Sequence, residues 1–203
     1  MKFYIELTIV NSADISFSVA WSKLYTQLHL AFVEQKDANQ QIPYGVSFPE
    51  YKVVESKGKR VMMLGSKLRV FAHSTDELQK LELDKWLART TDYVHVKSPK
   101  QVQNVTHYLT VNRYRPKPNV EKVAERFAKH KGIAYDDALQ HCQQHKKGWQ
   151  DYPYIHMKSF STKTEASVGR EFSLCISQTA VEKANQGKFS CYGLSTTSTV
   201  PHW

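Results

Sequence analysis

The chain has 203 residues and carries 28 Lys and Arg against 19 Asp and Glu, which gives a formal net charge of +9. An apolar content of 41% and an aromatic content of 12% exclude a disordered chain. No apolar stretch approaches the roughly 20 residues of a membrane span, no signal peptide is visible, and the three cysteines form no CxxC pair. We therefore expect a cytoplasmic protein without disulfides or membrane association.

The first half of the chain predicts the element order β-α-β-β-α-β, from alternating apolar residues in the strands and helical spacing in the helices. The predicted elements are a strand at 3–9, a helix at 18–35, strands at 45–49 and 67–72 paired across a polar loop at 55–60, a helix opened by a capping box at 74–77 and running through Trp86, and a strand at 93–96. This order is the ferredoxin-like arrangement.

The second half is less regular. It predicts an extended segment at 105–111, a non-helical proline-rich segment at 113–118, a helix capped by Asn119 and ending at Lys131 before Gly132, a second helix at 135–144, and strands at 152–158, 171–176 and 188–192. The fold class is thus α+β. We expect a ferredoxin-like domain over residues 1–96 and a smaller, irregular α+β domain over residues 97–203.

The excess positive charge lies in the second half. Residues 1–96 have a net charge of +1, whereas residues 97–203 have a net charge of +8. This asymmetry indicates a polyanionic partner, because each Lys or Arg that docks on a phosphate releases counterions. A basic, soluble surface without such a partner is the alternative.

A cationic helix face follows two arginines that the prolines hold out of helical structure. Arg113 and Arg115 could each present a bidentate fork to guanine. On the helix, the residues that share the cationic faces are Lys122, Arg126, Lys129 and His130. The pattern fits a helix lying along a nucleic-acid groove, and equally a solvated surface helix.

Other candidate sites are weaker. His141, Cys142 and His145 lie within about one helical turn, but nothing completes four metal ligands, so we expect no metal site. His29, taken alone, indicates a half-buried structural histidine. The small polar stretches at 159–162 and 190–195 are typical of turns. The nucleotide-binding and hydrolase motifs GxGxxG, Walker A and GxSxG are absent from the sequence.

Three segments together nevertheless resemble a known family. They are QLHLA around His29, GVSFP at 45–49 and CYGLS at 191–195. Their order and spacing are similar to those of the subtype I-F CRISPR-associated endoribonucleases, the Csy-type processors of CRISPR RNA. The resemblance covers essentially the whole chain.

The resemblance implies a ferredoxin-like domain followed by a domain that holds the stem-loop of the CRISPR repeat RNA. It implies metal-independent cleavage at the 3′ base of that stem, without a cofactor, leaving a 2′,3′-cyclic phosphate and a 5′-OH. His29 matches the catalytic histidine, Ser159 the catalytic serine and Tyr192 the tyrosine beside them. An imidazole near its ordinary pKa of about 6.5 can deprotonate the 2′-OH at neutral pH.

The resemblance also assigns RNA contacts. Arg113 and Arg115 match the base readers near the bottom of the stem; the family has Arg-x-Gln there, so Arg115 should prefer guanine. The remaining matched RNA-binding residues are Arg126, Lys129, His130, Ser161 and Phe172. We expect a protein that is monomeric on its own, stays bound to its product and joins the other subunits of the subtype I-F surveillance complex.

Two alternatives stay open. The chain could be a non-catalytic subunit that binds the RNA hairpin, with His29 purely structural. A basic scaffold subunit would also fit the charge distribution, but it leaves Arg113, Arg115 and His29 unexplained.

Overall fold

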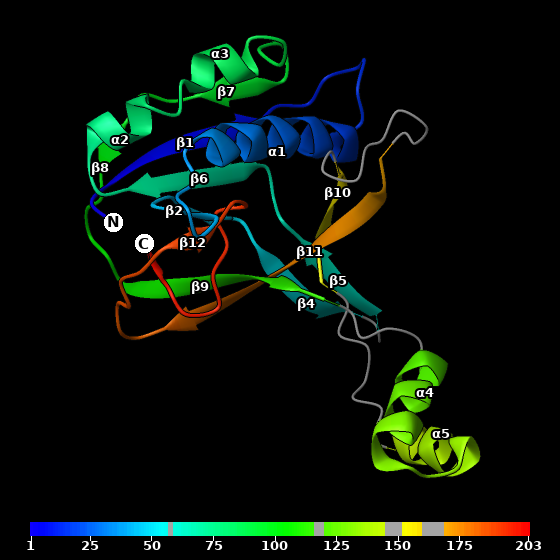
Figure 1. Ribbon diagram of the computed structural model, residues 1–203. Coiled ribbons are helices and arrows are strands. Elements are labelled where there is room, and N and C mark those ends of the chain that lie inside the picture. Colours follow the sequence, from blue (N-terminus) through cyan, green and yellow to red (C-terminus); the bar gives the residue numbers. More distant parts are fainter. Residues whose placement is uncertain (57–58, 116–119, 145–151, 160–168) are drawn as a thin grey trace. The chain divides into compact units, whose positions relative to one another are not determined.

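The computed structural model describes residues 1–56, 59–115, 120–144, 152–159 and 169–203 (Figure 1). The chain forms two units, one made of Met1–Tyr114 with Tyr152–Trp203 and the other of Arg115–Asp151. These division points do not coincide with the predicted boundary between residues 96 and 97, which stays a prediction. Helices and antiparallel strands both occur, as the α+β class predicts.

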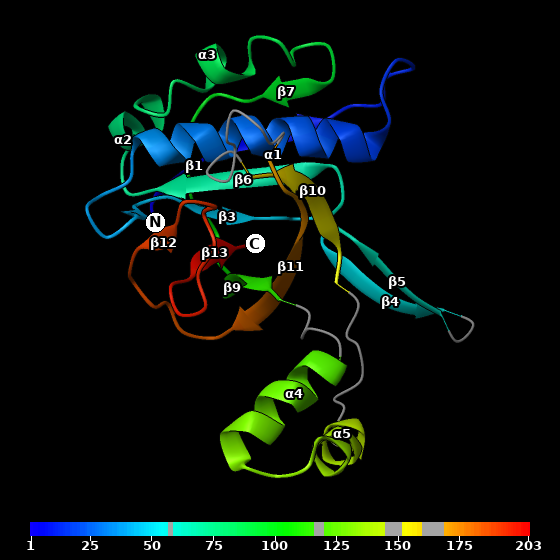
Figure 2. The same cartoon turned by 45° about the vertical axis from the view of Figure 1, so that its right-hand side comes forward.

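The first sheet of the larger unit places its strands in the order β3-β6-β1-β7, with every pair antiparallel. Its strands are β1 (Phe3–Ile9), β3 (Gly45–Ser47), β6 (Lys67–Ala72) and β7 (Val94–Val96), with β8 (Lys100–Gln101) also paired to β1. Helix α1 (Phe17–Glu34) runs along this sheet (Figure 2). Its apolar residues at helical spacing, from Trp21 through Leu24 and Leu28 to Phe32, are all buried, which confirms the predicted helix.

The helix predicted after residue 74 is two helices. The capping residue is confirmed, because the Glu77 N–H donates to Ser74 Oγ at 3.2 Å. However, α2 (Thr75–Gln79) ends early and α3 (Leu83–Leu87) starts after Glu82, whose φ of 44° is left-handed. Leu81 and Leu83 are both buried. Residues two apart point to different faces of a helix, so a break is needed to bring both into the core.

The polar loop predicted at residues 55–60 is also corrected. Its described residues, 55–56 and 59–60, belong to an antiparallel strand pair of β4 (Lys52–Ser56) and β5 (Lys59–Met63), in which Val54 lies opposite Val61. The valines flanking the polar stretch favour strands, and this preference outweighs the polar composition.

The second sheet has the strand order β10-β11-β9-β13. Its strands are β9 (His107–Tyr114), β10 (Tyr154–Lys158), β11 (Glu171–Val181) and β13 (Val200–His202). The sequence predicted β9, β10 and β11, but it placed β9 two to three residues too early and ended β11 too soon, and it missed β13. Only β12 (Phe189–Ser190) of the strand predicted at 188–192 is extended; it pairs with β2 (Gln41–Ile42), and a turn follows.

The smaller unit contains a helix pair. Helix α4 (Val120–Lys131) and α5 (Tyr135–Gln144) match the predicted positions, whereas the predicted cap Asn119 lies outside the described residues. Gly132 has a φ of +66°, and its N–H donates to the Ala128 carbonyl at 2.8 Å, so it ends α4 as predicted. Among the described residues, no helix is long and apolar enough to cross a membrane.

Candidate active site

His29 is held at the edge of the core by α1. Its neighbour Leu28 is fully buried, whereas the imidazole itself is half-buried. The Nδ1 atom lies 2.8 Å from the backbone carbonyl oxygen of Cys191. Because a carbonyl oxygen can only accept, Nδ1 carries the hydrogen and donates it. In the neutral ring, Nε2 therefore keeps its lone pair.

Tyr192 fixes the plane of this imidazole. The two rings are stacked, with centroids 4.1 Å apart and an interplanar angle of 1°. The backbone of Tyr192 is held in turn, since its carbonyl accepts a hydrogen bond of 2.9 Å from the hydroxyl of the fully buried Tyr25, one turn before His29 on α1. The imidazole is thus held by the stacked Tyr192 ring and by its own hydrogen bond to Cys191, while the Tyr25 hydrogen bond holds the backbone of Tyr192.

The turn that carries Cys191 and Tyr192 needs glycine at its third position. Gly193 has a φ of +71°, and a Cβ there would lie 2.7 Å from Val46 Cγ1. Its N–H donates to the Ser190 carbonyl at 2.8 Å, and its own carbonyl accepts from the Val46 N–H at 3.0 Å. The GVSFP and CYGLS segments therefore meet directly, with the second pressed against the first.

Burial sets the protonation of this cluster. Burial lowers the pKa of His29 below its ordinary value, although the hydrogen bond to the Cys191 carbonyl opposes the effect by favouring the charged ring. Burial also raises the pKa values of the Tyr192 and Tyr25 hydroxyls. At neutral pH the histidine is mainly neutral and both tyrosines are protonated, which leaves His29 Nε2 as the basic atom of the cluster.

Arg113 and Phe172 adjoin the stacked pair from neighbouring strands β9 and β11. The guanidinium carbon of Arg113 lies 4.9 Å from the Phe172 ring centroid and 6.0 Å from that of Tyr192. Phe172 also meets Tyr192 edge-on, with centroids 6.5 Å apart. The Arg113 Nε is buried without a hydrogen-bond partner among the described residues. Four of the predicted site residues thus form one contiguous cluster.

Ser159 comes directly after β10, and its N–H donates to the Arg170 carbonyl at 2.8 Å. Strand β10 packs on α1, where the Ser22 hydroxyl donates to the His156 carbonyl at 2.7 Å. Strand β10 therefore runs beside the helix that carries His29, and Ser159 follows at its end. Ser161 and most of the loop that follows it lie outside the described residues.

The remaining predicted RNA contacts belong to the smaller unit. Arg115 is exposed, and so are Arg126, Lys129 and His130 on α4. The apolar side of α4 faces α5 instead, where the Phe127 ring stacks on His141 with centroids 4.9 Å apart. The separation of cationic and apolar faces on α4 agrees with the sequence pattern.

No group of three or more His, Cys, Asp or Glu side chains within the described parts of the chain could hold a metal ion. Of the residues considered for one, His141 stacks on Phe127, Cys142 is half-buried on α5, and His145 lies outside the described residues. The cluster of His29, Tyr192, Arg113 and Phe172 has the imidazole as its titratable group nearest to neutral pH.

Two features of the site were not predicted from the sequence. The hydroxyl of Tyr25 and the carbonyl of Cys191 hold the turn and the histidine, respectively. Tyr25 lies four residues before His29, on the same helix face, which was a usable signal. The Cys191 carbonyl had none, because every residue type carries a backbone carbonyl.

The site thus consists of a half-buried histidine held between a helix and a glycine-containing turn, beside an arginine and an aromatic ring. The family described as CRISPR-associated protein (Cas_Csy4) matches residues 4–203, and the chain belongs to this family. This confirms the resemblance seen in the sequence.

Two relatives are each described as a CRISPR-associated endonuclease Cas6/Csy4. The protein from Escherichia coli (strain UTI89 / UPEC) is 27% identical over 202 residues, and that from Pseudomonas aeruginosa (strain UCBPP-PA14) is 29% identical over 202 residues. Both matches cover 99% of this chain and 99% of the relative. A solved structure described as an RAMP protein binding different RNA substrates covers 99% of both chains at 11% identity, but its TM-score of 0.35 supports no inference.

Proposed function

We propose that this protein is an endoribonuclease that cleaves precursor CRISPR RNA at the 3′ base of the repeat stem-loop, without a metal ion, leaving a 2′,3′-cyclic phosphate and a 5′-OH. The observation that carries the proposal is the hydrogen bond from His29 Nδ1 to the Cys191 carbonyl. It directs the basic Nε2 away from the turn and makes that atom the proton acceptor. Family membership and the endonuclease names of the relatives support the same activity.

The reaction uses a nucleophile that RNA itself supplies. His29 Nε2 accepts the proton of the 2′-OH next to the scissile phosphate, and the 2′-oxygen attacks phosphorus. The bond from phosphorus to the 5′-oxygen breaks, and that oxygen takes a proton from the protonated imidazole or from water. Ser159 holds the 2′-OH in line with the leaving oxygen, while Tyr192 keeps the imidazole plane fixed. DNA is not cut, because it has no 2′-OH.

Recognition of the stem is assigned to the two arginines that precede α4 and to an aromatic ring. Arg113 reads a base near the bottom of the stem, and Arg115 prefers guanine through its bidentate fork. Phe172, by the family resemblance, stacks on a base at the hairpin loop. The position of the Arg113 guanidinium beside Phe172 and Tyr192 supports a role close to the cleavage point.

Affinity for the RNA backbone is assigned to exposed polar groups. Arg126, Lys129 and His130 on α4 contact phosphates, together with Ser161. The exposure of Arg126, Lys129 and His130 supports the proposal, because no described acidic side chain forms an ion pair with these three residues. Charge neutralisation by such contacts makes binding depend steeply on salt.

The domain arrangement forms part of the proposal. Residues 1–96 make a ferredoxin-like domain, which the strand order β3-β6-β1-β7 and the placement of α1 between the first two of its strands in sequence support. Residues 97–203 make the RNA-hairpin-binding domain. The protein is monomeric on its own, keeps its product and joins other subunits of the subtype I-F complex in the cytoplasm. A non-catalytic hairpin-binding subunit is the alternative.

The deciding experiment incubates the protein with a labelled repeat hairpin in excess EDTA, beside a matched RNA with a 2′-deoxy substitution at the scissile nucleotide. Cleavage of the first RNA and protection of the second establish the metal-independent 2′-OH mechanism. Tight binding without cleavage of either RNA identifies the hairpin-binding subunit instead.

A further inference from the structure

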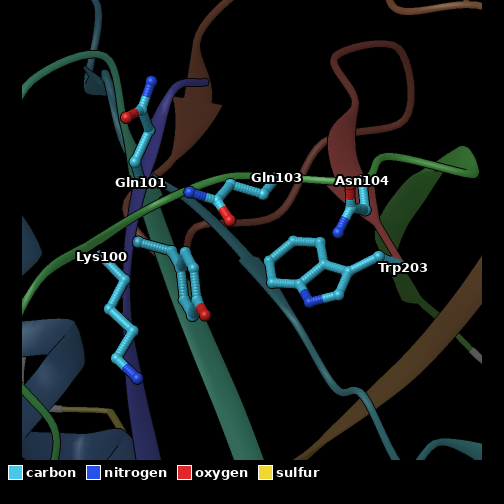
Figure 3. Close-up of a pocket in the computed structure, with 6 residues that line it drawn as sticks. Lys100, Gln101, Gln103, Asn104 and Trp203 are labelled. Atoms are coloured by element: carbon cyan, nitrogen blue, oxygen red, sulfur yellow. The ribbon is translucent and has the colours of Figure 1, made fainter.

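A second concave site lies in the larger unit and shares no residue with the His29 cluster. It is a pocket of about 440 Å³ that combines two aromatic rings, three amides and a lysine (Figure 3). Its lining residues are Tyr4 on β1, Lys100 and Gln101 on β8, Gln103 and Asn104 on the following segment, and Trp203. The volume lies within the range of small-ligand sites.

The aromatic wall is held in place from behind. The Trp203 ring meets Tyr4 edge-on with centroids 4.9 Å apart, and the guanidinium carbon of Arg69 lies 4.0 Å from the Trp203 ring centroid. Arg69 is fixed by an ion pair of 3.0 Å with the buried Glu6. Trp203 itself is only half-buried, so a fixed indole keeps an accessible surface at the pocket.

The three amides on the polar side of the pocket are available to a ligand. The amides of Gln101, Gln103 and Asn104 are exposed and make no hydrogen bond to any described residue. Asn104 has a left-handed φ of 53°, in a segment that passes the Trp203 indole (Figure 3). An amide offers a donor and an acceptor side by side, which matches the edge of a nucleobase, while an indole offers a stacking surface.

The charge of the pocket also favours a nucleotide. Lys100 is exposed at its rim, and none of the six lining residues is acidic. A lysine beside a base-sized cavity suits the phosphate attached to a base. We propose that this pocket binds one unpaired nucleotide of single-stranded RNA, with its base against Trp203 and its edge paired by Gln103 or Asn104. The site lies outside the proposed cleavage machinery.

The test follows the Trp203 indole N–H by NMR in uniformly ¹⁵N-labelled full-length protein. Trp203→Phe identifies its signal among the four tryptophans. The probes are octamers of ribo-A, ribo-C and ribo-U, the four ribonucleoside 5′-monophosphates, and inorganic phosphate. We expect an octamer to shift the Trp203 signal, a mononucleotide to shift it at higher concentration, and phosphate to leave it in place.

A double variant, Gln103→Ala with Asn104→Gly, removes both amides while the glycine keeps the left-handed backbone. It should weaken the octamer-induced shift at least about tenfold, whereas Asn39→Ala, an exposed amide elsewhere, should leave it unchanged. A Trp203 signal that no nucleotide moves, or that responds equally in the double variant, overturns the proposal. Cleavage of a flank-free hairpin should be unaffected by the double variant, so failure here is separable from failure of the proposed ribonuclease activity.

Discussion

The His29 cluster and the helix pair α4–α5 present the side chains of the proposed site in two different ways. In the cluster, the imidazole is fixed by a backbone carbonyl, a stacked ring and a helix whose neighbouring residues are buried. On α4, the cations Arg126 and Lys129 are exposed. Chemistry at one atom requires a fixed position, whereas attraction of a phosphate backbone requires only charge nearby. The two regions should therefore respond very differently to substitution.

The largest effect is expected for His29→Ala. Removal of the proposed base should reduce single-turnover cleavage of the repeat hairpin by about 10²–10⁴-fold, with hairpin affinity almost unchanged. Gel-based cleavage and fluorescence anisotropy measure the two quantities. His95→Ala, which removes an exposed histidine on β7, is the control. Cleavage that survives His29→Ala would identify His29 as a structural residue.

The next effect concerns the turn rather than the base. Gly193→Ala places a Cβ against Val46 and forces alanine into a left-handed conformation, so we expect a loss of about 2–4 kcal/mol in the free energy of unfolding. Gly132→Ala is a matched control, because its φ is also positive but no atom lies within 4 Å; it should cost only about 1 kcal/mol. Urea titrations measure both, and equal losses would show that the contact with Val46 is unimportant.

The pH dependence should report the buried imidazole. Because burial lowers the pKa of His29 in the folded protein, cleavage under single-turnover conditions should fall about tenfold per pH unit below that pKa and level off above it, with the midpoint under 6.5. The unfolded chain binds the proton more tightly, so the His29 contribution to stability is complete above about pH 6.5 and declines as the pH falls toward the folded pKa. A cleavage midpoint above 6.5 would contradict this environment for His29.

The smallest effect is expected on α4. Arg126→Ala should weaken hairpin binding a few-fold and reduce the slope of log K against log salt by about one unit, because one phosphate contact is lost. Arg89→Ala removes an exposed cation from the larger unit and controls for net charge. Affinity measured across a salt series tests the difference, and an unchanged slope in Arg126→Ala would remove this residue from the RNA interface.

The sequence predicted best where local signals were strong. Helix α1 follows from its regular apolar spacing, and the end of α4 follows from Gly132. Strand β13 was missed because it contains Pro201, which is tolerated only because the strand lies at the edge of the sheet beside β9. The break at Glu82 was missed because it depends on tertiary packing, which buries both Leu81 and Leu83 and cannot be read from the local sequence.

For the site, residue types could be predicted but their constraints could not. His29 and Tyr192 stood out through family motifs, and the structure stacks them. The hydrogen bond that determines which imidazole nitrogen is basic is accepted by the backbone carbonyl of Cys191. A backbone carbonyl gives no signal in the sequence, because every residue has one. The Arg113 contact with Phe172 depends on the pairing register of β9 with β11, which places Arg113 opposite Ile176, and register is fixed by the whole sheet.

The pairing of β11 with both β9 and β10 determines how far apart the chain leaves and re-enters the second sheet. Cys175 lies opposite Tyr114 on one side and opposite Tyr154 on the other. The chain therefore leaves β9 and re-enters at β10 only two strand spacings away, about 10 Å. A linker of a few residues spans that gap, so the helix pair is an exchangeable cassette. Exchanging it between relatives would combine the α4 cations proposed to bind phosphates in one protein with the proposed catalytic residues of another, and would leave the strand pairs of both sheets intact.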